Sequence, residues 1–370
     1  MGLIGSVISF MILICVLVIV HELGHLIIAR ANGVFCEAFS VGFGPVLWEK
    51  TDKKGTKWRF SLLPIGGYVK MFGDADATSV KETIPNGYTE EDMERMSAHR
   101  KKPWQRLLIA AGGPFANFIF AIFVLFSLSM IKGLPEPDNT ITVSGQESLA
   151  YISGLRDGDK IIKADGQDIH NFEEFRDKIT THSGKELSLS VKRDDKLEEI
   201  NVKMFKEEDG KIVPIKTLGV SPKGFVYKKV CILKAVSSSI VTTYTIASEN
   251  IKSIFKIITA KMSSKNVGGI ISIFKMSADS AEAGIAIFAG MLAMLSIVLG
   301  AINLLPIPVL DGGTIVLSAI EWIIGRPLNK KFVESIFMIG LIVVASLMLL
   351  GIWNDLSKCK FFVMLENLFK

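Results

Sequence analysis

The sequence has few cysteines and little excess of charge, and each of these features argues against certain classes of site or partner. Its four cysteines, Cys15, Cys36, Cys231 and Cys359, lie far apart and form no CxxC pair, so they indicate neither a disulfide framework nor a cysteine metal site. A net charge of +5 over 370 residues is too small to indicate a nucleic-acid partner. Only 21% of the residues are charged and 49% are hydrophobic, which excludes a disordered polymer and argues against an ordinary soluble globule.

Long uncharged stretches are abundant instead, and the mean hydropathy is +0.40. A bilayer core of about 30 Å requires roughly 20 apolar residues per helix. Four runs approach or exceed this length: 3–20, which resumes as far as residue 29 after a polar interruption, 107–131, 284–310 and 335–353. The first run lacks a basic stretch before it and a small-residue cleavage site, so we expect a retained helix rather than a signal peptide. The sequence therefore predicts a polytopic α-helical membrane protein with four spans.

The segments between these runs predict loops and one inserted domain. Residues 139–216 alternate short β-branched runs with turn signals, and residues 171–181 have the period of one helix, which is typical of a small α+β domain. Residues 230–262 mix apolar side chains with Lys and Ser, which indicates an amphipathic helix or a linker. Residues 60–72 are apolar, contain glycine and are too short to span, which favours a membrane-associated β-hairpin.

Basic residues near the ends of the spans predict the orientation of the chain. Lys and Arg gather after the first run, before the second, and between the third and fourth, so these loops should be cytoplasmic. Both termini and the inserted domain are then extracytoplasmic, and spans 1 and 3 run in the same direction. The predicted organisation is span 1 over 1–30, a cytoplasmic loop with the β-hairpin over 31–106, span 2 over 107–131, the inserted domain over 135–225, the amphipathic or linker segment over 226–283, span 3 over 284–311, a second cytoplasmic loop over 312–334, span 4 over 335–353 and a tail over 354–370.

A cluster of ionisable residues lies at the inner end of the first span, in the sequence HELGH over residues 21–25. At the centre of a spanning helix a charged side chain costs about 2.5 to 3.5 kcal/mol on insertion scales, so such residues need a role or a solvated helix end. Positions i and i+4 share one face of a helix. His21 and His25 can therefore present two imidazole nitrogens to one metal ion, and Glu22 can reach a water beside it.

A catalytic zinc site needs a third protein ligand, and Asp311 at the end of the third run is the candidate. Because spans 1 and 3 run in the same direction, their inner ends lie at similar depth, and topology allows Asp311 to meet both histidines. Pro306 and Pro308 interrupt the helix just before Asp311, and freed backbone there could bind a substrate strand. The alternative is a proline-kinked helix exit with a solvated aspartate.

Three ligands and an open fourth position predict peptide hydrolysis. A zinc ion in such a site lowers the pKa of its water to about 7, and Glu22 would take the proton from that water and pass it to the leaving amine. Because the site lies within or at the edge of the bilayer, its natural substrate is a peptide bond of another transmembrane helix, which must unwind locally to expose its carbonyls. The glycine-rich segment at Gly67 could hold such a substrate extended by strand addition.

These residues resemble the motifs of a known family. HELGH at 21–25 and NLLPIPVLDG at 303–312 look like the motifs of the site-2 intramembrane zinc metalloproteases of the bacterial RseP type, the regulator of sigma-E protease. The segments VGFGP at 41–45, LPIGGYVKM at 63–71 and GGPFAN at 112–117 are also similar to that family. The resemblance therefore covers both membrane halves of the chain.

The resemblance implies a cofactor and roles for individual residues. It implies zinc held by His21, His25 and Asp311, Glu22 as general base, and Asn303 as a residue that binds the substrate or polarises its carbonyl.

The resemblance also implies that the inserted domain is of PDZ type. The segments SGLRDGDKII at 153–162 and DGQ at 165–167 are similar to the turn and strand pattern of such domains. The best-known members carry two such domains, whereas this chain has room for one. Residues 267–270 are Val-Gly-Gly-Ile where a proline after the glycine is common.

Members of this family cut membrane-anchored regulators such as anti-sigma factors after another protease has trimmed the outer part, and some clear remnant signal peptides. The resemblance implies transmembrane substrates and the lipid bilayer as partners. It also implies a location in the bacterial inner membrane, with the active site near the cytoplasmic side, although an organellar membrane stays open.

Two other classes of function compete with the protease. One is a catalytically silent adaptor with a structural zinc and a peptide-binding PDZ-like domain, but a structural site has no need of Glu22. The other is a transporter, which would have inverted repeats or a polar path across several spans, and the sequence offers neither.

Overall fold

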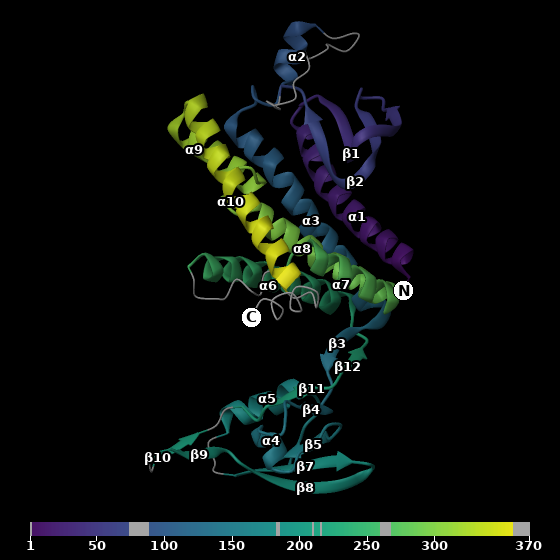
Figure 1. Cartoon of the computed structure of the whole chain (residues 1–370), viewed down its shortest axis with the longest axis vertical. Coiled ribbons are helices and arrows are strands. Elements are labelled where there is room, and N and C mark those ends of the chain that lie inside the picture. Colours follow the sequence, from purple (N-terminus) through teal and green to yellow (C-terminus); the bar gives the residue numbers. More distant parts are fainter. Residues whose placement is uncertain are drawn as a thin grey trace, which may run out of the picture. The chain divides into compact units, whose positions relative to one another are not determined.

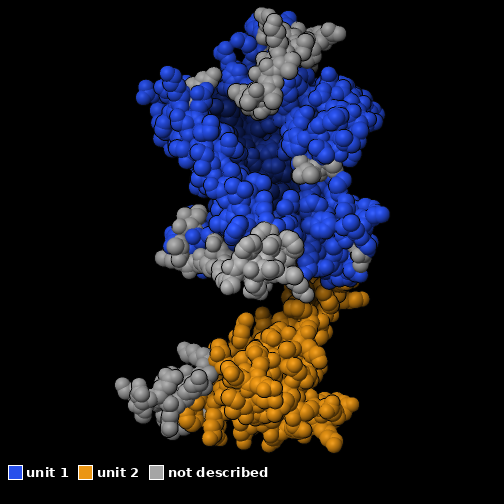
Figure 2. Space-filling view, viewed as in Figure 1, with its two compact units in different colours: residues 1–128, 236–370 blue, residues 129–235 orange. Residues whose placement is uncertain are grey.

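The computed structural model describes residues 2–73, 89–182, 186–208, 211–214, 217–259 and 268–357. The chain divides into two compact units (Figure 2). Unit 1 consists of Met1–Leu128 and Val236–Lys370, and unit 2 is the inserted segment Ser129–Ala235.

Four helices are long and apolar enough to cross a membrane: α1 Leu3–Ala31, α3 Pro103–Lys132, α8 Ile285–Asn303 and α10 Lys330–Ser357. Within unit 1, α1, α3 and α10 follow a similar slanted direction in Figure 1. These four helices and the inserted β-containing unit confirm a polytopic membrane protein with an inserted domain.

The segment between unit 2 and α8 contains two helices, α6 Ile232–Ile258 and α7 Ile270–Glu282. The sequence indicated one amphipathic helix over 230–262, and α6 corresponds to it. Helix α6 lies across the direction of the long helices (Figure 1), and its Ile246 and Ala247 pack against Ala121 of α3 and Ile297 of α8. The second helix, α7, was not predicted separately. The predicted tail over 354–370 lies mostly outside the described residues.

The predicted second cytoplasmic loop over residues 312–334 contains most of helix α9, Asp311–Ile324. The prolines and glycines around Asp311 suggest a helix end, but they allow a new helix to begin against the preceding turn. An added Cβ on Gly312 would lie 2.1 Å from the Leu305 carbonyl oxygen, and one on Gly313 would lie 2.6 Å from the Ile307 carbonyl oxygen. The two glycines therefore let the first turn of α9 pack directly on the backbone that links it to α8.

A sheet follows α1 and consists of two long, bent strands, β1 Cys36–Thr51 and β2 Lys57–Met71. Residues 36–41 of β1 pair with 67–71 of β2 on one side and with 57–60 on the other, while 46–51 pair with 57–61. The predicted hairpin segment 60–72 thus supplies one strand only, and its partner precedes it in the chain. The short helix α2, Glu90–Met96, follows the sheet.

The turn of this sheet is tied to the end of α1. Arg30 of α1 donates hydrogen bonds to the carboxylate of Asp52 and to Thr56, and the Trp58 indole also donates to Asp52. Burial alone would raise the pKa of Asp52, but the hydrogen bonds from Trp58 and Arg30 outweigh it and lower that pKa to about 2. Leu26 and Ala29 of α1 share a buried apolar cluster with Phe39 and Val41 of β1, which completes the attachment. The sheet is therefore fixed beside the helix that carries HELGH.

Unit 2 is a small α+β domain. Its main sheet has the order β6–β5–β7–β8, and its other pairs are β4 with β11, β3 with β12 and β9 with β10. The elements are β3 Leu134–Pro137, β4 Ile141–Val143, α4 Leu149–Ile152, β5 Lys160–Ala164, β6 Gln167–Asp168, α5 Phe172–Thr181, β7 Glu186–Arg193, β8 Lys196–Lys203, β9 Phe205–Glu208, β10 Lys211–Pro214, β11 Val220–Pro222 and β12 Phe225–Lys228. The stretch 139–216, expected to alternate short strands with turns, contains β4 to β10, and α5 matches the expected helix over 171–181.

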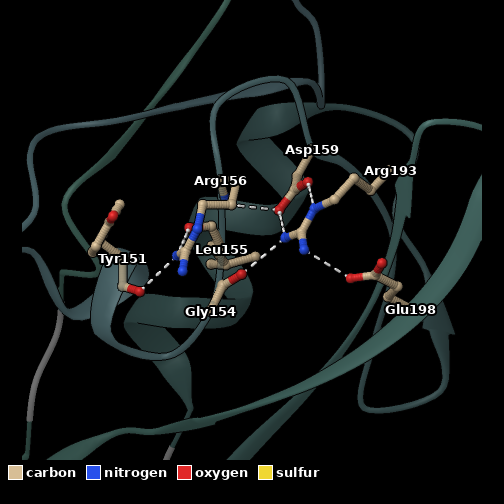
Figure 3. Close-up of polar contacts among 7 residues, drawn as sticks. All are labelled: Tyr151, Gly154, Leu155, Arg156, Asp159, Arg193 and Glu198. Atoms are coloured by element: carbon tan, nitrogen blue, oxygen red, sulfur yellow. Dashed lines mark hydrogen bonds and ion pairs between the residues drawn. The ribbon is translucent and has the colours of Figure 1, made fainter.

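A buried ion pair holds the loop before β5 to the end of β7 (Figure 3). Arg193 donates to both carboxylate oxygens of Asp159 at 2.8 Å and also contacts Glu198 and the Gly154 carbonyl. The Asp159 side chain is fully buried. Its hydrogen bonds raise the pKa of Arg193 above its ordinary value. A bidentate pair of this kind fixes geometry as well as charge.

Replacing Asp159 with Ala should destabilise unit 2 by about 3 kcal/mol, because Arg193 loses its buried charged partner and keeps only Glu198 and the Gly154 carbonyl. Hydrogen exchange of the β7 and β8 amides, followed by mass spectrometry, measures this. The control Glu198→Gln removes a half-exposed partner and should cost less than about 1 kcal/mol. Equal exchange in both variants would mean that Asp159 is not the main support.

Candidate metal centre

Three side chains far apart in sequence converge in unit 1. His21 and His25 lie one helical turn apart on α1, and Asp311 is the first residue of α9. One ligand atom from each residue lies within 4.8 Å of those of the other two. His21 Nε2 is 3.2 Å from Asp311 Oδ2, and His25 Nε2 is 3.4 Å from Asp311 Oδ1. The structure therefore contains the meeting of Asp311 with both histidines that the predicted topology allows.

The donor set suits zinc, which prefers imidazole nitrogen and carboxylate oxygen in tetrahedral sites. Asp311 Oδ2 is buried and has no hydrogen-bond partner among the described residues. A buried carboxylate oxygen without a donor is costly unless a cation faces it. The two histidine Nε2 atoms, 3.3 Å apart, face the same point, so the residues present fit a zinc ion.

The other ring nitrogen of each histidine is held by α3. His25 Nδ1 lies 2.8 Å from the Ile109 carbonyl oxygen, and because a carbonyl only accepts, Nδ1 carries the proton and Nε2 is left free for a metal. His21 Nδ1 lies 3.1 Å from the side-chain amide of the fully buried Asn117. A 180° rotation of that amide brings its oxygen opposite Nδ1, which again leaves Nε2 free. Partners of this kind orient metal ligands.

Glycines let α3 approach the HELGH turn closely. An added Cβ on Gly24 of α1 would lie 2.1 Å from the Gly112 carbonyl oxygen, which makes this contact one of helix packing. An added Cβ on Gly113 would instead lie 2.3 Å from His25 Nε2 and 2.7 Å from His21 Cε1. Small residues in a spanning helix are typical of helix packing, whereas Gly113 and Asn117 contact the histidines. The segment GGPFAN was the available signal, but it does not show which face of α3 meets α1.

The remaining predicted site residues also lie near the cluster. Asn303, the last residue of α8, places its side-chain nitrogen 3.4 Å from His21 Nε2. Glu22 contacts the backbone of Val69 in β2. An added Cβ on Gly67, in the same strand, would lie 3.5 Å from Glu22 Cγ. The structure therefore brings Glu22, Asn303 and Gly67 to the same region as the three converging side chains.

A cavity of about 850 Å³ opens onto this cluster, and unit 1 is hollowed on the face seen in Figure 2. It is lined by His21, Glu22, His25 and Asp311, by residues 67–69 of β2, and by α3, α9 and α10. Thr314, Ser318 and Glu321 give the α9 wall a polar stripe. Arg106 of α3 pairs with Glu321 across the cavity lining. The site is thus accessible and partly polar, as hydrolysis requires.

Comparison with known proteins identifies the family. Residues 9–347 match peptidase family M50. The chain belongs to this family. It is 32% identical over 364 residues to a zinc metalloprotease of Agrobacterium fabrum, with 96% of each chain covered. It is 34% identical to one of Rickettsia conorii, covering 95% of this chain and 99% of that protein. It is 31% identical to the metalloprotease MmpA of Caulobacter vibrioides, covering 100% and 99%.

Membership in family M50 makes the protein a zinc-dependent metalloendopeptidase of the site-2 type, and the four long apolar helices make it a membrane protein. This confirms the resemblance, the enzyme class and the cofactor expected from the sequence.

Substituting Gly113 with Ala should lower zinc affinity by at least tenfold, because the new methyl group would push both histidine rings away from Asp311. The measurement is zinc content per chain after dialysis against chelators of graded strength. Gly290→Ala on α8 is the matched control, since its nearest neighbour would be Leu128 at 3.9 Å. Zinc retention by Gly113→Ala equal to that of the control would show that the spacing between α3 and the histidines is not critical.

Proposed function

We propose that the protein hydrolyses peptide bonds within transmembrane segments of membrane-anchored proteins. The observation that carries the proposal is the convergence of His21, His25 and Asp311 at one end of a cavity that also contains Glu22. His21 lies about 27 Å from the start of α1 at 1.5 Å per residue. The site therefore lies near the far end of a bilayer core of about 30 Å.

In this proposal His21 Nε2, His25 Nε2 and one carboxylate oxygen of Asp311 hold the zinc ion. When bound, zinc supplies the Lewis acidity that activates water and polarises the scissile carbonyl. Glu22 follows His21 directly in the same helix and borders the same cavity. Its carboxylate takes the proton from the attacking water and then donates it to the leaving amide nitrogen. The side-chain amide of Asn303 donates a hydrogen bond to the substrate carbonyl oxygen.

The edge of β2 is the proposed substrate-binding site. Within the described part of the chain, residues 67–71 pair with β1 on one side only, and residues 67–69 line the cavity beside Glu22. A helical substrate hides its carbonyls in i to i+4 hydrogen bonds and must be extended before attack. Adding it as a strand along this edge would satisfy its backbone while a peptide bond faces the site. Gly67 keeps the edge close to α1, since an added Cβ would lie 2.6 Å from Val18 Cγ1.

The finer biological role follows the family resemblance. We infer regulated intramembrane proteolysis in a bacterial inner membrane, with anti-sigma factors or remnant signal peptides as the kind of substrate and prior trimming by another protease. Unit 2 would be a PDZ-like domain that captures or excludes the trimmed C-terminus. Both chain termini and unit 2 would be extracytoplasmic, with the metal centre near the cytoplasmic side. Family membership and the position of Glu22 favour this enzyme over a silent adaptor.

Replacing Glu22 with Gln should reduce cleavage by 10²- to 10⁴-fold, the typical contribution of a positioned general base, while zinc stays bound. Cleavage of a co-purified single-span substrate in detergent, with zinc content measured in parallel, tests this. Glu49→Gln is the control, because Glu49 is a surface carboxylate of β1 paired with Arg59. Normal cleavage by Glu22→Gln would remove Glu22 from the mechanism, and inertness of every form including wild type across several substrates would favour the adaptor.

Replacing Gly67 with Val should lower cleavage at least tenfold and leave zinc content unchanged. The new side chain would collide with Val18 and with the Ser40 carbonyl oxygen, at 2.6 and 2.7 Å from the Cβ position, and so displace the strand edge but none of the ligands. Leu62→Val, at an exposed position of the same strand, should cleave normally. Unchanged cleavage by Gly67→Val would contradict the proposed substrate-binding site at the edge of β2.

A further inference from the structure

A two-stranded ribbon begins where α3 ends. Strand β3 starts at Leu134, two residues after Lys132, and pairs with β12 in the register Leu134 with Lys228 through Pro137 with Phe225. The last turn of α3 and both strands belong to unit 2. Gly133 joins helix and ribbon at φ 95°, and an added Cβ there would lie 2.5 Å from the Lys228 carbonyl oxygen. The helix end therefore fixes the near end of the ribbon.

The two faces of the ribbon differ in character. Directly paired residues point to the same side of a sheet, so Phe225 and Tyr227 share one face with Pro135 and Pro137. This aromatic face is exposed, since Phe225 and Tyr227 keep 61% and 47% of their surface accessible. Val226 and Lys228 lie on the opposite face, where Lys228 Nζ pairs with Glu136 Oε2 at 2.5 Å.

The unit itself leaves this aromatic face uncovered. The buried core cluster of the described part of unit 2 includes no residue of β3 or β12. A two-stranded ribbon is marginally stable on its own in water, and two prolines remove backbone donors from β3. Exposed aromatic side chains on such an element indicate a surface that another phase or molecule covers.

The length of the ribbon limits what can cover it. Four residues of strand extend about 13 Å, and the head-group layer on each side of a bilayer core is roughly 5 to 8 Å thick. The apolar run of α3 ends at Ile131, next to Lys132, so the near half of the ribbon lies within one such layer thickness of the end of that run. Tyr227 pairs with Pro135, which lies three residues after the end of α3, so Tyr227 lies in this half.

The charges at the helix end match an anionic surface. Lys132 lies with its ammonium group 5.9 Å from the centre of the Tyr227 ring, and Lys228 and Lys229 follow the aromatic residues. The one carboxylate within the ribbon strands, Glu136, is already paired with Lys228. Basic residues near the surface attract anionic lipids by about 1 kcal/mol each. Aromatic rings with polar or charged neighbours are characteristic of membrane interfaces.

We propose that the aromatic face of the β3–β12 ribbon is embedded in the head-group layer of an anionic phospholipid bilayer, at the surface where α3 leaves the membrane. Phe225 and Tyr227 insert between head groups, while Lys132 and Lys229 contact lipid phosphates. The ribbon then anchors the start of the inserted unit at the membrane surface. The partner is the lipid itself.

The test uses the full-length chain with its native cysteines replaced and one new cysteine labelled with the fluorophore NBD. Phe225→Cys and Tyr227→Cys report on the aromatic face, and Val226→Cys on the opposite face is the matched control. Each protein is reconstituted into vesicles of phosphatidylglycerol and phosphatidylethanolamine, with or without brominated acyl chains. A parallel series uses phosphatidylcholine alone. Zinc content confirms that each labelled chain is folded, and the readout requires no cleavage, so it is independent of the proposed reaction.

We expect quenching by brominated lipid to be at least twofold stronger at positions 225 and 227 than at 226, and stronger in phosphatidylglycerol vesicles than in phosphatidylcholine. Lys132→Gln with Lys229→Gln should remove that lipid dependence. Equal quenching at all three positions would overturn the proposal. Protection from an aqueous quencher without quenching by lipid would also overturn it, since a protein would then cover the face. Equal quenching in the two lipids would overturn the role given to the lysines.

Discussion

The structure depends on the need to gather two imidazoles and a carboxylate at the end of a membrane-spanning helix. Polar groups at that depth are costly unless they satisfy one another or bind an ion. His21, His25 and Asp311 do so by converging from α1 and α9. The helix α3 supports them, because Ile109 and Asn117 occupy the second nitrogen of each ring. The close approach that this requires is possible only where glycines line the contact between α1 and α3.

The bent β1–β2 sheet serves the same site from the other side. Arg30, five residues beyond His25, binds Asp52 and Thr56 at the turn of the sheet. This attachment and the apolar contacts of α1 with β1 bring residues 67–69 to the cavity wall beside Glu22. In the proposed function, a strand edge next to the general base suits a substrate that must be unfolded before it is cut. Substrate binding and chemistry would then share one cavity, which also has polar groups along α9.

The inserted unit has its own stability, built on an apolar core and on the Arg193 to Asp159 pair. Its ribbon differs from the rest of the unit, because it exposes aromatic residues next to the end of a spanning helix. In our proposals the membrane therefore acts on the protein twice. It surrounds the metal centre and its substrate, and its head-group layer binds the β3–β12 ribbon at the end of α3.

The sequence by itself determined what depends on local spacing and on composition. Four spans follow from run length, the HELGH face follows from the i, i+4 geometry of a helix, and the small α+β unit follows from β-branched runs and turn signals. Topology allowed Asp311 to meet the histidines, because two spans of the same direction place their inner ends at similar depth, and the tertiary structure shows the contact. The family motifs implied the zinc cofactor and the roles of individual residues, which spacing alone does not determine. Membership in family M50 confirmed the zinc enzyme.

Only the tertiary structure decided which residues meet across elements. Prolines followed by glycines predict a helix end, yet Gly312 and Gly313 lie in the first turn of α9. They are needed there because this turn packs against the Leu305 and Ile307 carbonyls. Gly113 and Asn117 contact the histidines only because of the face of α3 that meets α1, and the sequence does not specify that face. The partners of β2 and the pairing of Arg193 with Asp159 are likewise contacts between distant segments. Such contacts are set by the packing of whole elements, which local periodicity does not encode.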